Sequence, residues 1–216
     1  MLKVRAFLFL ALASICRVRA EEDLQSIEKR AAAGEADAQL ALGALYDQGE
    51  GVPKDQLKAA EWFARAAAQG NAQAQFNVAA MYANGYGIPK DDSKAVVWYE
   101  KSATQGLVDA QFNLAVMYAS GRGVPKNEAR AAGWYEKAAL QGFTRAQFNL
   151  GLMNIAGQGM PKDGLRGYAW FVVAAADGDP AAIKNRDFIA KKLKPETKAA
   201  GQKLAQELAT KIKRPL

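Results

Sequence analysis

A period of 36 residues runs through this chain and limits it to a repeat architecture. Glycine recurs at positions 49, 85, 121 and 157, and proline recurs at 53, 89, 125 and 161. All four tryptophans of the chain occupy one position of the period: Trp62, Trp98, Trp134 and Trp170. A repeat of this length is one supersecondary unit, which buries its apolar side by stacking on its neighbours. The sequence therefore predicts a solenoid.

Each repeat is expected to hold two helices. In the second repeat, apolar residues have the spacing of one helical face both before and after the loop. Before the loop they are Ala74, Val78, Met81 and Tyr82, and after it they are Ala95, Trp98, Tyr99 and Ala103. Glycines in the loop end the first helix, and Pro89 prevents it from continuing. Asp91 is a good N-cap for the second helix, and its counterparts are Asp55, Asn127 and Asp163. We therefore predict an all-α fold, a right-handed α-solenoid of antiparallel helix pairs.

The residues that keep this period also resemble a known repeat. The first copy contains Ala38, Leu42, Gly43, Tyr46, Gly49, Gly51, Pro53, Asp55, Trp62, Phe63, Ala66, Ala67 and Gly70. This pattern is similar to the Sel1-like repeat, a relative of the tetratricopeptide repeat with a longer, glycine-rich first loop. The resemblance covers residues 36–71, 72–107, 108–143 and 144–179, and a half repeat precedes them at 21–35. Three departures are expected to affect only packing: Ala79 and Ala115 replace a glycine, and Asn154 replaces a tyrosine.

The first twenty residues are typical of a signal peptide. Lys3 and Arg5 precede an apolar run at 6–15, and residues 18–20 (Val-Arg-Ala) suit cleavage after Ala20. We expect export, with the periplasm favoured over secretion. The sequence leaves two alternatives open, an uncleaved anchor and a lipoprotein modified at Cys16. Because Cys16 is the only cysteine, a chain cleaved after Ala20 has no disulfide, which is consistent with a bacterial envelope protein.

Positive charge gathers at the two ends of the chain. The net charge of +7 divides into +4 for residues 1–20, −4 for 21–180 and +7 for 181–216. Residues 180–216 are expected to form basic helices that cap the solenoid, since a terminal repeat needs a polar outer surface. The alternative is a weak contact between this basic segment and an anionic surface such as lipid headgroups.

Motifs that could carry chemistry are weak throughout. The chain has no histidine, and no cluster of metal-ligand residues stands out. The Gly85-x-Gly87-x-x-Lys90 pattern superficially resembles a phosphate loop, but it recurs four times and does not follow a strand. The Ser26-x-x-Lys29 pattern lacks the companion motifs of penicillin-interacting enzymes. We predict no catalytic residue, no cofactor, no metal and no nucleic-acid partner.

The first helices offer a better candidate for binding. One position of the period holds Asn77, Asn113, Asn149 and Asn185, and the position before it holds Phe76, Phe112 and Phe148. By resemblance to tetratricopeptide domains this position faces the concave groove, where carboxamides could hold a peptide backbone beside apolar rings. The alternative is structural, with each asparagine bound to a nearby carbonyl and each phenylalanine packed between repeats. Asp37, Asp109 and Arg145 lie nearby and are expected to be solvated.

The function predicted from these patterns is that of an exported, monomeric scaffold that binds a protein or peptide partner through its concave face and does not catalyse a reaction. One alternative is a cell-wall or β-lactam-related hydrolase, since some cysteine-rich relatives of this repeat are linked to penicillin binding. Those relatives carry a disulfide in each repeat, which this chain lacks. The other alternative is an envelope anchor that uses the basic end of the chain.

Overall fold

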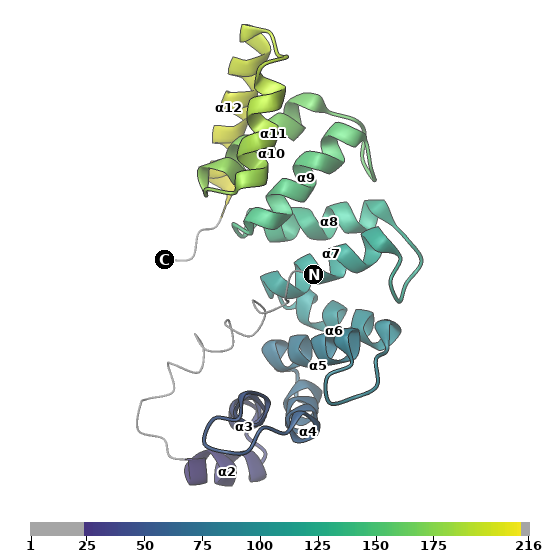
Figure 1. Ribbon diagram of the computed structural model, residues 1–216, viewed down its shortest axis with the longest axis vertical. Coiled ribbons are helices and arrows are strands. Elements are labelled where there is room, and N and C mark those ends of the chain that lie inside the picture. Colours follow the sequence, from purple (N-terminus) through teal and green to yellow (C-terminus); the bar gives the residue numbers. More distant parts are fainter. Residues whose placement is uncertain (1–23, 213–216) are drawn as a thin grey trace. The chain divides into compact units, whose positions relative to one another are not determined.

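The computed structural model describes residues 24–212, and over this range it contains eleven helices and no strand (Figure 1). The prediction of an all-α fold is confirmed. The predicted signal peptide lies outside the described residues. The helices are α2 (Leu24–Ala32), α3 (Ala36–Gln48), α4 (Gln56–Ala68), α5 (Ala72–Asn84), α6 (Asp92–Thr104), α7 (Val108–Ser120), α8 (Glu128–Leu140), α9 (Thr144–Ala156), α10 (Gly164–Ala176), α11 (Pro180–Ala190) and α12 (Pro195–Lys211).

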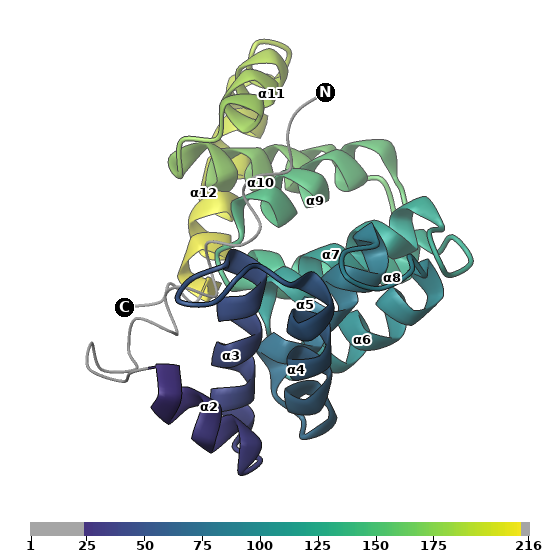
Figure 2. The same cartoon turned by 60° about the horizontal axis from the view of Figure 1, so that its bottom comes forward.

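The helices form two compact units that divide at residues 105 and 106. We call the helices α2–α6 unit 1 and the helices α7–α12 unit 2. In unit 1, α3 packs on α4 and α5 packs on α6, and α4 joins the two pairs by its contact with α5 (Figure 2). Unit 2 repeats this arrangement with α7, α8, α9 and α10. Each of these eight helices is 13 residues long, so the repeats are nearly identical in size.

The predicted caps fix where the helices begin and end. Asp91 accepts a hydrogen bond from the Lys94 backbone N–H at 3.0 Å, and the same cap forms at Asp55, Asn127 and Asp163. Gly85 ends α5 in the left-handed region, with φ of 75°. A second loop glycine, Gly87, also has positive φ, and a Cβ there would collide with the backbone of Gln56 on α4. The glycine-rich loop is therefore required both for the turn and for close packing.

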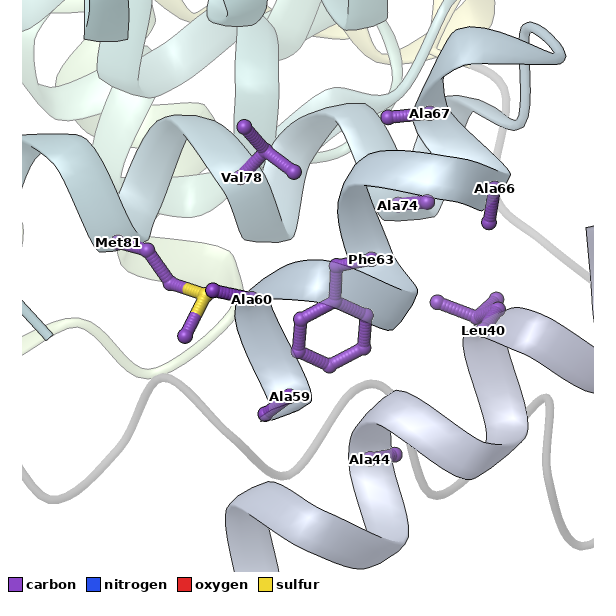
Figure 3. Close-up of a cluster of buried hydrophobic side chains, with 10 residues drawn as sticks. All are labelled: Leu40, Ala44, Ala59, Ala60, Phe63, Ala66, Ala67, Ala74, Val78 and Met81. Atoms are coloured by element: carbon purple, nitrogen blue, oxygen red, sulfur yellow. The ribbon is translucent and has the colours of Figure 1, made fainter. Parts of the chain in front are cut away.

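Small residues let the paired helices approach closely. In unit 1, Phe63 on α4 packs among Leu40, Ala44, Ala74 and neighbouring apolar residues (Figure 3). A Cβ on Gly43 would lie 2.6 Å from the Phe63 ring, so this helix pair requires glycine there. The same conflict, at 2.5 Å, exists between Gly151 and Phe171 in unit 2. The core of each helix pair thus combines an aromatic ring with glycine or alanine.

A further periodic feature links the end of each repeat to its predecessor. The side-chain Nε2 of Gln69, Gln105 and Gln141 donates to the carbonyl of Gly34, Gly70 and Gly106 respectively, at 2.8–3.0 Å. The same Nε2 donates to the Oε1 of a buried glutamine on a first helix at 2.8 Å, and these acceptors are Gln39, Gln75 and Gln111. We call these six residues the glutamine ladder. The sequence analysis missed it, although its members keep the 36-residue period.

The C-terminal helices close unit 2. Asp179 caps α11 and is followed by Pro180. Both α11 and α12 pack on α10, and Gly201 of α12 lies against the ring of Tyr168. On α10, Trp170 is fully buried. The other three tryptophans are only half-buried, and each lies under a cation: Arg65 over Trp62, Lys101 over Trp98 and Lys137 over Trp134, at 3.8–4.3 Å from the ring centre. The sequence places Trp98 on an apolar face and gives the other three tryptophans the same repeat position, but full burial is found only at Trp170.

Candidate partner-binding surface

The predicted asparagine row in unit 2 lies beside an exposed apolar row. Asn113, Asn149 and Asn185 are half-buried on α7, α9 and α11. Three residues further along each helix, on the same face, lie Val116, Leu152 and Phe188. Leu152 is 40% exposed and Phe188 is 58% exposed, so this face presents apolar side chains to solvent. We call these six residues the first-helix face. The sequence analysis did not single out the apolar row, although its 36-residue spacing is visible in the sequence.

The asparagines do not all make the same hydrogen bond. Asn149 bonds with the hydroxyl of Tyr135, a buried side chain on α8. Asn185 donates from Nδ2 to the carbonyl of Ala181 on its own helix at 2.8 Å. In unit 1, the Oδ1 of Asn77 accepts from Gln73 at 3.2 Å. The carboxamides are thus partly engaged within the fold, and their role in binding a partner stays a prediction.

The phenylalanines pack mainly inside their own helix pairs. Phe76 is 6% exposed and lies 5.7 Å from Tyr99, ring centre to ring centre. Phe112 is half-buried and lies 5.6 Å from Tyr135. Phe148 is also half-buried and lies 5.6 Å from Phe171. Each phenylalanine packs on the second helix of the same repeat, so a large part of its ring area already contributes to the core.

Charged residues line the N-terminal turns of the same helices. Asp109 on α7 is buried, which corrects the expectation that it is solvated. Burial raises the pKa of its carboxyl, and the nearby guanidinium of Arg145 on α9 lowers that pKa by a smaller amount. In unit 1, Asp37 is exposed and accepts a hydrogen bond from Asn71 at 3.0 Å. The Asp109 carboxyl and the Arg145 guanidinium thus interact electrostatically between α7 and α9.

Two classes of site lack support in the described residues. Over residues 24–212, no group of three or more His, Cys, Asp or Glu side chains is arranged to hold a metal ion. Within the same range, no helix is both long enough and apolar enough to span a bilayer.

Comparison with known proteins agrees with this architecture. The Sel1 repeat matches the chain at residues 36–71, 72–107, 108–143 and 144–179. The chain belongs to the Sel1 repeat family. The resemblance seen in the sequence is therefore confirmed, and with it the α-solenoid fold class.

Two solved structures show the relationship in detail. One is a protective antigen present in uropathogenic Escherichia coli strains that displays an SLR fold. It is 35% identical, with a TM-score of 0.79 over 95% of this chain and 44% of that protein. The other is a Sel1 repeat protein from Oxalobacter formigenes, 30% identical, with a TM-score of 0.75 over 95% of this chain and 85% of that protein. This chain thus spans less than half the length of the E. coli antigen. No curated protein matches it.

Membership in the Sel1 repeat family assigns a class of role. Sel1 repeats form non-catalytic scaffolds that generally mediate protein–protein interactions. In unit 2, the first-helix face combines exposed apolar area with hydrogen-bonding groups.

Proposed function

We propose that this Sel1 repeat protein is an exported scaffold that binds a protein or peptide partner through the first-helix face of unit 2. The observation that carries the proposal is the exposure of Leu152 and Phe188 beside Asn149 and Asn185. Apolar side chains at one repeat position, flanked by carboxamides, offer both buried area and backbone hydrogen bonds to an extended chain. The predicted signal peptide at 1–20 supports export to the periplasm or beyond.

A paired-variant experiment tests the binding face. Leu152→Glu combined with Phe188→Glu introduces charge into the apolar row, and both side chains are exposed, so the fold should be kept. The control is Leu57→Glu, because Leu57 is 58% exposed on the second helix α4. Co-purification from the native envelope, read by mass spectrometry, should lose one recurrent protein in the double variant and keep it in the control. Equal recovery from both would refute the proposal.

The asparagine row has its own test. Asn113→Ala combined with Asn149→Ala is expected to weaken partner binding while lowering the melting temperature by only a few degrees. Because Asn149 bonds with Tyr135, the comparison should be repeated in a Tyr135→Phe background, where that bond is absent. A large loss of stability in this background would mean that the asparagines are structural.

Intact-mass measurement of the mature protein tests export, and the expected first residue is Glu21.

A second candidate function is docking on an anionic surface by the basic end of the chain. Its support is the charge of +7 in residues 181–216 and the exposure of Lys191, Lys198 and Lys203. Deleting α12 would uncover α10, so truncation is an unsuitable test. Replacing these three lysines with glutamine removes charge and keeps the packing. Binding to phosphatidylglycerol vesicles that survives this change would exclude the basic-surface mechanism.

A further inference from the structure

The first-helix face of unit 2 is bordered by two further rows of residues. One row lies four residues before the asparagines, and the other lies four residues after the apolar residues. Residues four apart share one side of a helix, so both rows border the face. We call them the flanking rows: Asp109, Arg145 and Ala181 in the first, and Ser120, Ala156 and Lys192 in the second. The inference below rests on the proposed function, because it concerns the chemistry of the partner that this face binds.

The flanking rows present two cations to solvent, while their one acid is buried. Arg145 is exposed in the first turn of α9. Lys192 is exposed directly after α11, and its Nζ lies 4.0 Å from the centre of the Phe188 ring, so its charge stands beside the apolar row. The acid is Asp109. The first-helix face therefore has an exposed positive charge at each of its two edges.

The exposed acid that adjoins the apolar row in the chain does not neutralise these cations. Asp187 precedes Phe188, and it accepts a hydrogen bond from Nε of Arg186 at 2.8 Å. This bond lowers the pKa of the Asp187 carboxyl, and the positive charges of Lys191 and Lys198 lower that pKa further. Its charge is therefore balanced by cations outside the flanking rows. Over residues 24–212, neither cation of the flanking rows forms a salt bridge.

Unit 1 lacks both features at the corresponding positions. Its apolar row holds Ala44 and Ala80, where unit 2 has valine, leucine and phenylalanine. Its first flanking row holds Asp37, which is exposed, and Gln73, where unit 2 has the exposed arginine. The first helices of unit 1 thus offer little apolar area and an acid in place of a cation. A segment that carries bulky apolar and acidic side chains suits unit 2 and does not suit unit 1.

We propose that the partner segment bound by the first-helix face is acidic as well as apolar. Its apolar side chains pack on Leu152 and Phe188, and its backbone bonds with the asparagine row. Its carboxylates pair with Arg145 and Lys192. Because Lys192 lies over the Phe188 ring, an acidic residue next to a large apolar residue satisfies both contacts at once. Charge pairs at the rim of an interface favour the right partner and speed association, and salt screens them.

The test is a selection of random dodecapeptides, displayed on phage, by the purified protein, with deep sequencing of the enriched peptides. Peptides that depend on the face are those enriched by the unmodified protein and lost with Leu152→Glu combined with Phe188→Glu. We expect these peptides to contain more Asp and Glu than the starting library. Arg145→Gln combined with Lys192→Gln should still select apolar peptides but should lose this acidic preference.

Two controls isolate the charge at the face. Lys162→Gln combined with Lys211→Gln changes the net charge by the same amount, and both lysines are exposed outside the face and its flanking rows, so the acidic preference should persist. Arg145→Lys combined with Lys192→Arg keeps both charges and should also keep the preference. Lys192→Gln alone, at an exposed residue that follows α11, keeps the test valid if the loss of Arg145 destabilises unit 2.

Fluorescence anisotropy then measures how much the charge contributes to affinity. The most enriched peptide is compared with a neutral version in which Asn and Gln replace its Asp and Glu. We expect the neutral version to bind about two- to tenfold more weakly at low salt, which is the range for two exposed ion pairs. This difference should disappear with Arg145→Gln combined with Lys192→Gln, and it should shrink as the salt concentration rises.

The outcomes separate this inference from the proposed function. If the unmodified protein and Leu152→Glu with Phe188→Glu select the same peptides, the proposed function fails, and the inference fails with it. If face-dependent peptides are selected but have no acidic preference, the proposed function stands and the inference is overturned. The same conclusion follows if the acidic preference persists when both Arg145 and Lys192 are replaced by glutamine.

Discussion

Asp177 interrupts the glutamine ladder, and replacing it with glutamine should stabilise unit 2. Residue 177 corresponds to Gln69, Gln105 and Gln141. Each of these glutamines donates one hydrogen bond to a glycine carbonyl of the preceding repeat and one to the buried glutamine on the first helix of its own repeat. A carboxylate cannot donate. The acceptor that would receive the second bond, Oε1 of Gln147, is buried without a partner among the described residues. An unpaired buried acceptor of this kind costs free energy.

The backbone at position 177 already suits a glutamine. Asp177 has φ of −86° and ψ of 6°, and Gln141 has φ of −90° and ψ of 7°. We expect the new side chain to donate to Gln147 and to the carbonyl of Gly142, by register with the other repeats. Each net hydrogen bond contributes about 0.5–1.5 kcal/mol. The loss of the long Thr144 contact to Asp177, at 3.4 Å and exposed, subtracts little.

The expected gain is therefore about 1–2 kcal/mol in the free energy of unfolding. For a chain of this size, it corresponds to a rise of roughly 2–8 °C in melting temperature. The assay is urea and thermal unfolding followed by circular dichroism. Asp177→Asn is the control, because it removes the same negative charge from the C-terminus of α10 with an amide that is one methylene shorter. Equal gains from glutamine and asparagine would attribute the effect to charge and refute the ladder argument.

Three further predictions concern individual side chains. Burial raises the pKa of the Asp109 carboxyl, so above that pKa its charged form lowers the free energy of unfolding. Asp109→Asn should therefore stabilise the protein more at pH 7 than near pH 4, as measured by urea unfolding. Burial raises the pKa of Tyr135 from 10.0 to about 12, so stability should fall as pH rises through this interval, and Tyr135→Phe should reduce the fall at a cost near neutral pH of about 1 kcal/mol. Trp170→Ala should lower the free energy of unfolding by about 3–5 kcal/mol, whereas Trp134→Ala should lower it by less than about 2 kcal/mol because Trp134 is half-buried. Thermal unfolding of the two variants checks this order.

Local signals in the sequence were sufficient to predict the helix pairs. Caps such as Asp91 and loop glycines such as Gly85 act through backbone geometry within a few residues, so their effect can be read without knowing the fold. The same holds for Asp179 and Pro180 at the start of α11. These local rules, together with the 36-residue period, account for the fold class.

Features that depend on neighbouring helices were harder to predict. Trp170 is fully buried whereas the other three tryptophans are half-buried, and no local pattern indicates this difference. The burial of Asp109 likewise depends on tertiary packing. Asn154 was visible as a departure from the repeat, but its burial, at 2% exposure, depends on the helices around it.

The central claim, that the first-helix face of unit 2 binds a protein partner, is tested most directly by site-specific photo-crosslinking in the native host. A benzophenone amino acid replaces Leu152 on this face or, as a control, Leu57 on α4, and the chain is expressed with residues 1–20. The account predicts one recurrent protein adduct from position 152, absent from position 57 and reduced by Asn113→Ala with Asn149→Ala. No adduct at position 152, or the same adducts from both positions, would contradict it.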